Sequence, residues 1–195
     1  MTATDDDLVR AHLDGDPRAF DELVRRHEAR VYAVCVRVIG DADEAADAAQ
    51  DAFLAAYRKL AQFRGDARFT TWLHRIAVNA CYDSLRRRSR QPMLRLVDDE
   101  GAPFEAGPAQ PDHADQVVGS HSAAVALASI PEEFRVAIVL ADVEDLPYDE
   151  IASILDVPVG TVKSRVHRGR IALAKAMGVE RGEPRRVPRA SQEEP

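Results

Sequence analysis

A break in helical periodicity near residue 156 constrains the fold of this chain more than any other feature. From Tyr148 the sequence reads YDEIASILDVPVGTVKSRVHRGRIAL. Its first part places Ile151, Ala152 and Leu155 on one face of a short helix, and Pro158 prevents that helix from running on. A second helix follows the turn and would bury Val162, Val166, Gly169 and Leu173. The pattern predicts a helix-turn-helix at residues 149–173.

The exposed face of the second helix would carry groups that read DNA. At about 100° per residue, its outward side chains are Thr161, Ser164, Arg165 and Arg168, flanked by Lys163 and His167. Arginine can donate two hydrogen bonds to guanine, and hydroxyls and lysine bind phosphates or base edges. The alternative is an ordinary surface helix with a basic face. Because no acidic residue lies between Val159 and Lys175, and because a turn precedes the helix, the DNA-reading interpretation is favoured.

Helices are also predicted in the first half of the chain. Residues 17–39 carry apolar side chains at helical spacing, and Gly40 then ends that helix. Asp41 is a good N-cap for a helix that runs to about Leu60, and Glu44 completes a capping-box pattern. The inner face of this helix would carry Ala46, Ala49, Phe53, Tyr57 and Leu60.

The regular pattern stops in the middle of the chain and again near its end. Residues 91–114 are rich in proline, glycine and acidic residues, which predicts an extended acidic linker. Residues 178–195 have almost no apolar side chain, so a disordered tail is expected. We therefore expect an all-α fold with two small helical domains, at residues 8–90 and 115–177, of which the C-terminal one is the helix-turn-helix.

The charge of the chain is separated into acidic and basic segments. The formal net charge is −7 at pH 7. Acidic residues collect at 41–51 and 98–115, whereas basic residues collect at 86–90 and 163–175. A chain of this kind can meet nucleic acid with one surface and a protein with another.

The two cysteines and the hydropathy of the chain indicate its cellular compartment. Cys35 and Cys81 lie far apart in apolar helical patterns, so two buried thiols in a reducing cytoplasm are expected rather than a disulfide or a zinc site. No apolar run is long enough to span a bilayer, and the N-terminus lacks the apolar core of a secretory signal. We expect a cytoplasmic protein without membrane insertion.

The stretch FRGDARFTTWLHRIAVNACYDSLRRR carries a second nucleic-acid signal. On a helix over residues 70–88, one stripe holds Trp72, Arg75, Asn79, Tyr82 and Arg86. Aromatic rings stack on unpaired bases, asparagine reads base edges and arginine binds phosphate. The preceding loop, residues 63–69, has Gly65 at its centre and could form a pocket for a flipped base. The alternative is that the two rings of the stripe are ordinary core residues.

Acidic side chains lie largely outside the apolar face of the helix expected at residues 41–60. They are Asp43, Glu44, Asp47 and Asp51, with Gln50 beside them. A charged face in contact with solvent is the simplest explanation. The functional alternative is a docking surface for a basic or amphipathic partner helix.

Together these segments resemble the extracytoplasmic-function (ECF) class of RNA polymerase sigma factors. DADEAADAAQDAFLAAYRKL looks like the family's core-binding segment, and the stretch containing WLHRIAVN looks like its promoter-melting segment. The stretch from IPEEFRV to GTVKSRVHRGRIALAKAM looks like its upstream-promoter-binding domain. The resemblance covers about residues 8–90 and 115–177. It implies a sigma factor that binds core RNA polymerase and directs promoter-specific initiation.

The resemblance also implies a role for each segment. The polymerase clamp would contact Asp47, Gln50, Asp51 and Phe53. The opened minus-ten strand would contact Phe63, Arg64, Phe69, Trp72, Arg75, Asn79 and Arg86. The minus-thirty-five duplex would contact Thr161, Lys163, Ser164, Arg165, His167 and Arg168. The implied partners are core RNA polymerase, through its clamp and flap regions, promoter DNA and a dedicated anti-sigma factor.

Two other functions compete with this interpretation. An enzyme would need a nucleophile–base pair or a metal cluster, but the histidines are scattered and no HExxH, GxSxG or glycine-rich phosphate loop occurs. We therefore expect no catalytic site, no cofactor and no bound metal. The serious alternative is a stand-alone helix-turn-helix transcriptional regulator whose first domain binds a ligand or forms dimers. Association with core polymerase would distinguish a sigma factor from such a regulator.

Overall fold

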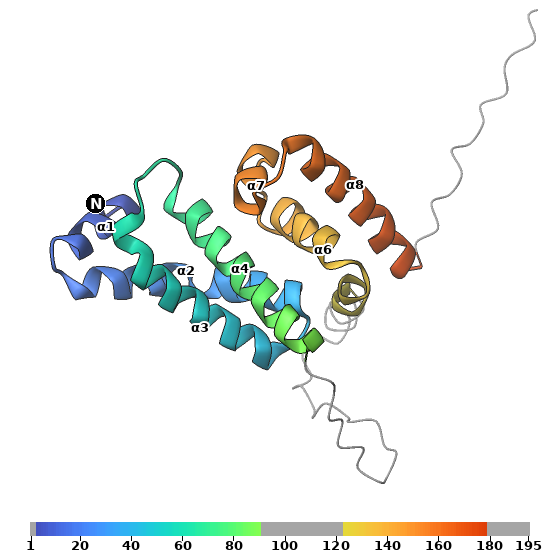
Figure 1. The fold of residues 1–195 in the computed structure, drawn as a ribbon, viewed down its shortest axis with the longest axis horizontal. Coiled ribbons are helices and arrows are strands. Elements are labelled where there is room, and N and C mark those ends of the chain that lie inside the picture. Colours follow the sequence, from blue (N-terminus) through green and yellow to red (C-terminus); the bar gives the residue numbers. More distant parts are fainter. Residues whose placement is uncertain (1–2, 91–122, 179–195) are drawn as a thin grey trace, which may run out of the picture.

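The computed structural model describes residues 3–90 and 123–178, and every regular element in these two ranges is a helix (Figure 1). The first range contains α1 (Asp5–Leu13), α2 (Pro17–Ile39), α3 (Ala42–Lys59), the 3-10 turn η1 (Leu60–Gln62) and α4 (Phe69–Arg90). The second range contains a helical segment at residues 123–129, α6 (Glu132–Ile138), the π-helical turn η2 (Val139–Val143), α7 (Tyr148–Leu155) and α8 (Val159–Ala176). We call these ranges the first lobe and the second lobe.

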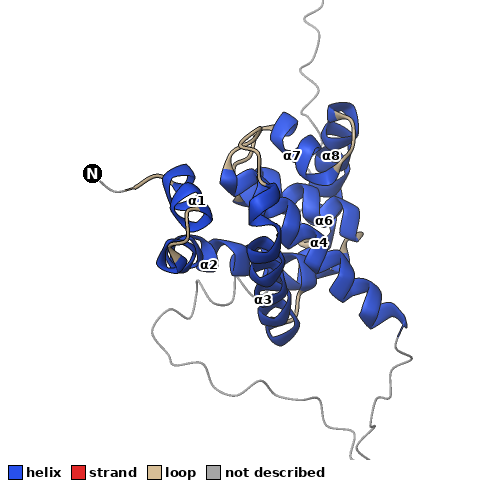
Figure 2. Cartoon of the chain, turned by 60° about the vertical axis from the view of Figure 1, so that its left-hand side comes forward, coloured by secondary structure: helices blue, strands red, loops and turns tan. Residues whose placement is uncertain are grey.

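The predicted all-α fold with two helical parts is confirmed, and Figure 2 shows only helices and connecting loops in both lobes. The predicted linker at residues 91–114 lies outside the described residues. The predicted tail at residues 178–195 also lies outside them, apart from Gly178.

Local side-chain chemistry determines where the helices begin. The Asp41 carboxylate accepts hydrogen bonds from the backbone N–H groups two and three residues further on, at 3.0 and 2.9 Å, and so caps α3 as predicted. The other half of the predicted capping box does not form, because the Glu44 carboxylate instead accepts a hydrogen bond from the Ser84 hydroxyl at 3.4 Å. A complete capping box occurs at α1, where Thr4 and Asp7 satisfy each other's backbone N–H groups.

In the first lobe α2, α3 and α4 pack against one another, and α1 packs on α2. The buried face of α3 consists of Ala45, Ala48, Ala49, Ala52 and Ala56, whose small side chains allow close helix packing. The predicted inner face is therefore wrong at two positions, because Ala46 is exposed and Tyr57 is 53% exposed. Alanines occur on several sides of α3, so apolar spacing alone does not determine which side is buried.

The two cysteines lie in the core of this helical bundle. Cys35 of α2 and Cys81 of α4 are fully buried, and neither forms a disulfide. A hydrogen bond with Cys35, together with burial, raises the pKa of the Cys81 thiol far above its usual range. The prediction of two buried thiols is confirmed, and Cys81 stays protonated and acts as a packing group.

In the second lobe α8 crosses α6 at a glycine. A β-carbon at Gly169 would lie 2.6 Å from Cδ1 of Ile138 and 3.1 Å from the carbonyl oxygen of Phe134. Only glycine therefore lets the two helices approach this closely.

The two lobes pack directly against each other, which the sequence pattern did not predict. Their buried side chains form one continuous apolar cluster, and α4 lies between α3 and α7 (Figure 1). The buried Glu144 carboxylate of the second lobe pairs with Arg30 of α2 and lies 3.4 Å from the His74 ring of α4. The buried Arg135 guanidinium donates to the Val38 carbonyl, in the last turn of α2, at 2.6 Å. The lobes thus share both apolar and charged contacts.

The ion pair at Glu144 should make stability depend on pH. Burial alone would raise the pKa of the Glu144 carboxyl, but hydrogen bonds from His74 and Arg30 outweigh it and lower that pKa below its ordinary value of 4.5. A carboxyl whose pKa is lowered in the folded state stabilises the fold above its unfolded pKa, and this stability is lost as pH falls through the folded pKa. We therefore expect the difference in unfolding free energy between the natural protein and a Glu144→Gln variant to shrink below about pH 4.5.

Urea unfolding of both proteins, at neutral pH and at about pH 3, measures this difference. Comparing the two proteins removes the contribution of the other carboxylates, because these are present in both. A difference that stays constant with pH would contradict the expectation.

Candidate nucleic-acid interface

The helix-turn-helix forms at the residues where it was predicted. Asp156 caps the C-terminal end of α7 and adopts the left-handed backbone conformation with a φ of 53°, and Pro158 directly precedes α8. Aspartate tolerates this conformation because its short side chain can hydrogen-bond locally. On its inner face α8 buries Val162, Val166 and Gly169, while Leu173 is half-buried.

The outer face of α8 presents cations and hydroxyls to solvent. The exposed residues are Lys163, Ser164, His167 and Arg168. Within the described residues none of their side chains forms an ion pair, whereas Arg165 pairs with Glu133 of α6 at 3.1 Å and Arg170 pairs with Asp142 at 2.5 Å. Thr161 is half-buried in the wall of a hollow of about 320 Å³ between α6 and α8. The structure therefore exposes four of the six predicted residues, whereas Thr161 and Arg165, which were expected to point outward, are half-buried beside α6. The exposed Arg168 guanidinium forms no ion pair with the described residues.

Three aromatic rings gather at the start of α4. The ring centroids of Phe63, Phe69 and Trp72, which we call the aromatic cluster, lie 5.3 to 5.9 Å apart, within the range of favourable ring packing. Phe69 is 3% exposed, whereas the other two rings are half-buried. Residues 64–68 form an exposed loop above them, and Gly65 turns this loop with a φ of 75°. The loop predicted to hold a base, residues 63–69, thus begins at Phe63 and ends at Phe69, two members of this partly accessible aromatic cluster.

The polar members of the predicted stripe on α4 are exposed, namely Arg75, Asn79 and Arg86. Its rings, Trp72 and Tyr82, are half-buried, so the alternative that they are core residues holds in part. Asn79 lines a hollow of about 340 Å³ between α3 and α4 together with Arg58 and Lys59 of α3. These two cations were not predicted as site residues. Only the packing of α3 on α4 brings them beside Asn79, so no local pattern could have identified them.

The acidic side of α3 is exposed at Asp47, Gln50 and Asp51. It forms one wall of a hollow of about 380 Å³, whose other wall is the basic end of α4. Arg87 lies 3.5 Å from Asp51, so part of the acidic charge is neutralised within the lobe. Phe53 is half-buried against the core. Leu54, 47% exposed and three residues after Asp51, is an apolar member of this surface that the sequence pattern missed.

The second lobe contacts the first turn of α4, next to the loop that precedes this helix. The Thr71 hydroxyl donates a hydrogen bond to Glu150 of α7 at 2.7 Å. Beside this contact lies a cleft of about 490 Å³, whose lining includes Arg68, Asp149 and Glu150. Because carboxylates repel phosphates, this arrangement of the lobes disfavours a DNA backbone in the cleft.

Comparison with known proteins identifies the family. The model for Sigma-70 region 2 matches residues 23–91, and the model for Sigma-70, region 4 matches residues 121–173. The chain is 40% identical over 184 residues to the RNA polymerase sigma-H factor of Pseudomonas aeruginosa. The aligned region covers 89% of this chain and 93% of that protein. It is 40% identical over 177 residues to the ECF RNA polymerase sigma-E factor of Escherichia coli K12, with 87% and 92% covered. The chain belongs to the ECF sigma factors.

Two solved structures resemble this ECF sigma factor over most of its length. The sigma factor RpoE in complex with the anti-sigma factor NepR from Bartonella quintana has a TM-score of 0.65 and 27% identity, covering 83% of this chain and 98% of that one. CnrH in complex with the cytosolic domain of CnrY has a TM-score of 0.64 and 26% identity, covering 89% and 97%. Because the matches cover so much of the chain, the likeness extends to both lobes.

As an ECF sigma factor, the protein binds core RNA polymerase and directs promoter-specific transcription initiation. The region 2 match contains α3, α4 and most of α2, and the region 4 match contains α6, α7 and most of α8. The co-occurrence of both regions in one chain disfavours a stand-alone regulator. α1 precedes both matched regions.

Proposed function

We propose that the ECF sigma factor divides promoter recognition among three surfaces. The second lobe places α8 in the major groove of the minus-thirty-five element and reads it with Thr161, Lys163, Ser164, Arg165, His167 and Arg168. The first lobe holds the opened minus-ten strand with Phe63, Arg64, Phe69, Trp72, Arg75, Asn79 and Arg86. The acidic side of α3 docks on the polymerase clamp through Asp47, Gln50, Asp51 and Phe53. The observation that carries the proposal is the outer face of α8, where the exposed Lys163 and Arg168 form no ion pair with the described residues.

The two lobes must separate before they can contact both promoter elements. About 25 base pairs separate the centres of these elements, on the order of 85 Å of duplex. A compact body of this size has a radius of gyration of only roughly 15 Å. The chain between the lobes, residues 91–122, is long enough to allow separation, since it could reach about 100 Å if fully extended. Docking on polymerase therefore opens the contact between the lobes.

The protein acts in the cytoplasm, where core polymerase and promoter DNA are found, and its part in initiation is binding rather than catalysis.

An anti-sigma factor holds it inactive by covering both lobes. This partner is proposed because RpoE was solved in complex with an anti-sigma factor. No helix in residues 3–90 and 123–178 is long and apolar enough to cross a membrane. Recovery of polymerase subunits alone with the tagged protein from cells would contradict the anti-sigma proposal.

Reconstitution with core polymerase tests the main proposal. Core enzyme should retain the purified protein, and the resulting holoenzyme should start transcription at a specific promoter in a runoff assay. Retention without promoter-specific initiation would overturn the assignment of the DNA-reading surfaces.

Replacing Arg168 with alanine should weaken binding to the minus-thirty-five element by about five- to 150-fold, because a guanidinium–guanine pair is worth about 1–3 kcal/mol. Core binding should be unchanged, because Arg168 lies on the second lobe and not on α3. Fluorescence anisotropy of the holoenzyme on promoters with an intact or scrambled minus-thirty-five element measures the effect.

The matched control is Arg170→Ala. It removes the same charge from the same helix, but Arg170 is already engaged by Asp142, so only a small, sequence-independent loss is expected. If both variants lose affinity equally, or if Arg168→Ala also binds core less tightly, the recognition role of Arg168 is wrong.

A further inference from the structure

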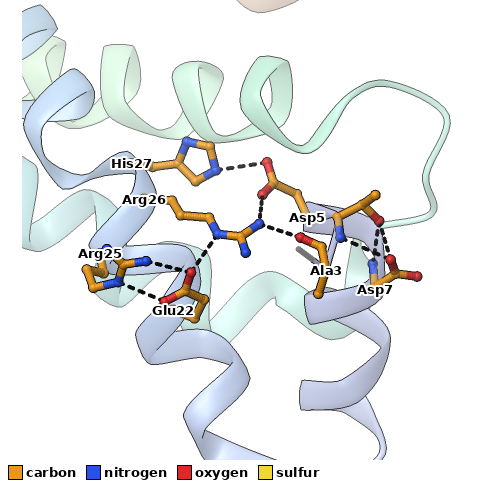
Figure 3. A network of polar contacts seen from close by, with 8 residues as sticks. Ala3, Asp5, Asp7, Glu22, Arg25, Arg26 and His27 are labelled. Carbon is orange, nitrogen blue, oxygen red and sulfur yellow. Dashed lines mark hydrogen bonds and ion pairs between the residues drawn. The ribbon is translucent and has the colours of Figure 1, made fainter. Parts of the chain in front are cut away.

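A network of polar contacts ties the first turn of α1 to α2 (Figure 3). The Asp5 carboxylate accepts a hydrogen bond from Arg26 at 3.3 Å and lies 2.9 Å from Nε2 of His27. Arg26 also donates to the Ala3 carbonyl at 2.7 Å and to Glu22 at 2.8 Å. Several bonds therefore hold the Asp5 side chain and the start of α1 in one place.

His27 connects this network to the aromatic cluster. The His27 side chain is only 12% exposed. Its ring centroid lies 5.5 Å from that of Phe69, with 50° between the ring planes. Phe69 packs in turn against Phe63 and Trp72. Asp5 therefore contacts His27, His27 contacts Phe69, and Phe69 belongs to the aromatic cluster.

The Asp5 carboxylate restricts the ring of His27. A free imidazole can rotate and can carry its proton on either nitrogen, whereas a carboxylate beside one nitrogen fixes both the proton position and the ring orientation. With the His27 ring fixed, the ring of Phe69 has a rigid neighbour on that side. The positions of Phe63 and Trp72, which pack on Phe69, depend on this support.

We propose that Asp5 and His27 are positioning residues for promoter opening. Asp5 orients His27, and His27 supports Phe69, so the aromatic cluster is held ready for an unstacked base although neither residue touches DNA. The inference rests on the proposed function of the aromatic cluster at the minus-ten strand. It gives α1, which lies outside the matched region 2, a part in that step.

The test uses full-length protein reconstituted with core polymerase and a fluorescent fork-junction DNA that carries a single-stranded minus-ten element. Asp5→Ala and His27→Ala should bind this DNA about three- to tenfold more weakly, the range set by the loss of one hydrogen bond. Affinity for core polymerase should not change. His27→Phe, which keeps a ring against Phe69, should bind the fork more tightly than His27→Ala.

Asp14→Ala is the matched control, because it removes the same charge from the other end of α1, and the exposed Asp14 side chain neither contacts His27 nor lines the cleft beside the loop. It should bind the fork as the natural protein does. The proposal is wrong if Asp5→Ala and His27→Ala bind the fork normally, or if they lose core affinity to the same degree. Trp72→Ala tests the aromatic cluster itself. If Trp72→Ala has no effect, the proposed function fails. If only Trp72→Ala weakens fork binding, the positioning role fails.

Discussion

Replacing Gly169 with alanine is expected to destabilise the second lobe and to weaken minus-thirty-five binding with it. The added methyl group would lie 2.6 Å from Cδ1 of Ile138, and Ile138 is 3% exposed, so its side chain has little room to move. Overpacking of this kind costs about 1–3 kcal/mol, whereas alanine regains up to about 1 kcal/mol over glycine in helix propensity. We expect a net loss of unfolding free energy in urea, together with a displaced α8.

Gly160→Ala is the matched control on the same helix. A β-carbon there meets nothing within 4 Å, so this variant should be more stable by up to about 1 kcal/mol. The double variant Gly169→Ala/Ile138→Ala should lose less unfolding free energy than the sum of the losses of the two single variants. The Ile138 substitution removes the Cδ1 atom with which the added methyl group clashes. Additive losses would show that the approach at Gly169 is not the cause.

The second large effect is expected from Arg135→Met. The Arg135 guanidinium donates hydrogen bonds to the carbonyls of Val38, Ala128 and Ile130 at 2.6, 2.9 and 3.0 Å. Burial lowers the pKa of this side chain below its ordinary value. Val38 lies in the last turn of α2, where carbonyl groups lack a helical donor and the helix dipole favours a cation. Methionine has a similar length but no donor. It would leave three carbonyls unpaired, at about 1–3 kcal/mol for each one that stays buried.

We therefore expect Arg135→Met to lower the unfolding free energy by about 3 kcal/mol or more and to loosen the contact between the lobes. Urea unfolding measures the first effect, and a pair of distance labels, one on each lobe, measures the second. Arg37→Met is the control, because among the described residues the exposed Arg37 side chain bonds only to the Ala33 carbonyl of its own helix. It should change stability by no more than about 0.5 kcal/mol. Equal effects of the two variants would contradict the role of Arg135.

The parts of the fold that depend on sequence neighbours could be predicted. The helix-turn-helix was predictable because Pro158 blocks one helix, Asp156 accepts the left-handed turn and the apolar spacing of α8 determines its inner face. The N-cap at Asp41 was predictable for the same reason. The segments expected to contact DNA and polymerase followed from the family resemblance, and most of their polar residues are exposed in the structure.

The contacts between distant residues could not be predicted. Arg135 and Val38 are 97 positions apart, and Arg30 and Glu144 are 114 apart, so no local pattern records these pairs. The face that α3 buries was also predicted wrongly at two positions. On a helix this rich in alanine, burial is decided by the neighbouring helices rather than by the contrast between apolar and polar side chains.

The direct packing of the two lobes has a consequence for how much protein a cell must make. If only molecules with separated lobes can engage a promoter through polymerase, the apparent dissociation constant equals the intrinsic one divided by the fraction of separated molecules. A substitution at Glu144 or Arg135, which lie in the contact between the lobes, would change that fraction and so shift the concentration at which the sigma factor begins to act. On that condition, the contacts of these two buried charges help to set the protein concentration at which transcription begins.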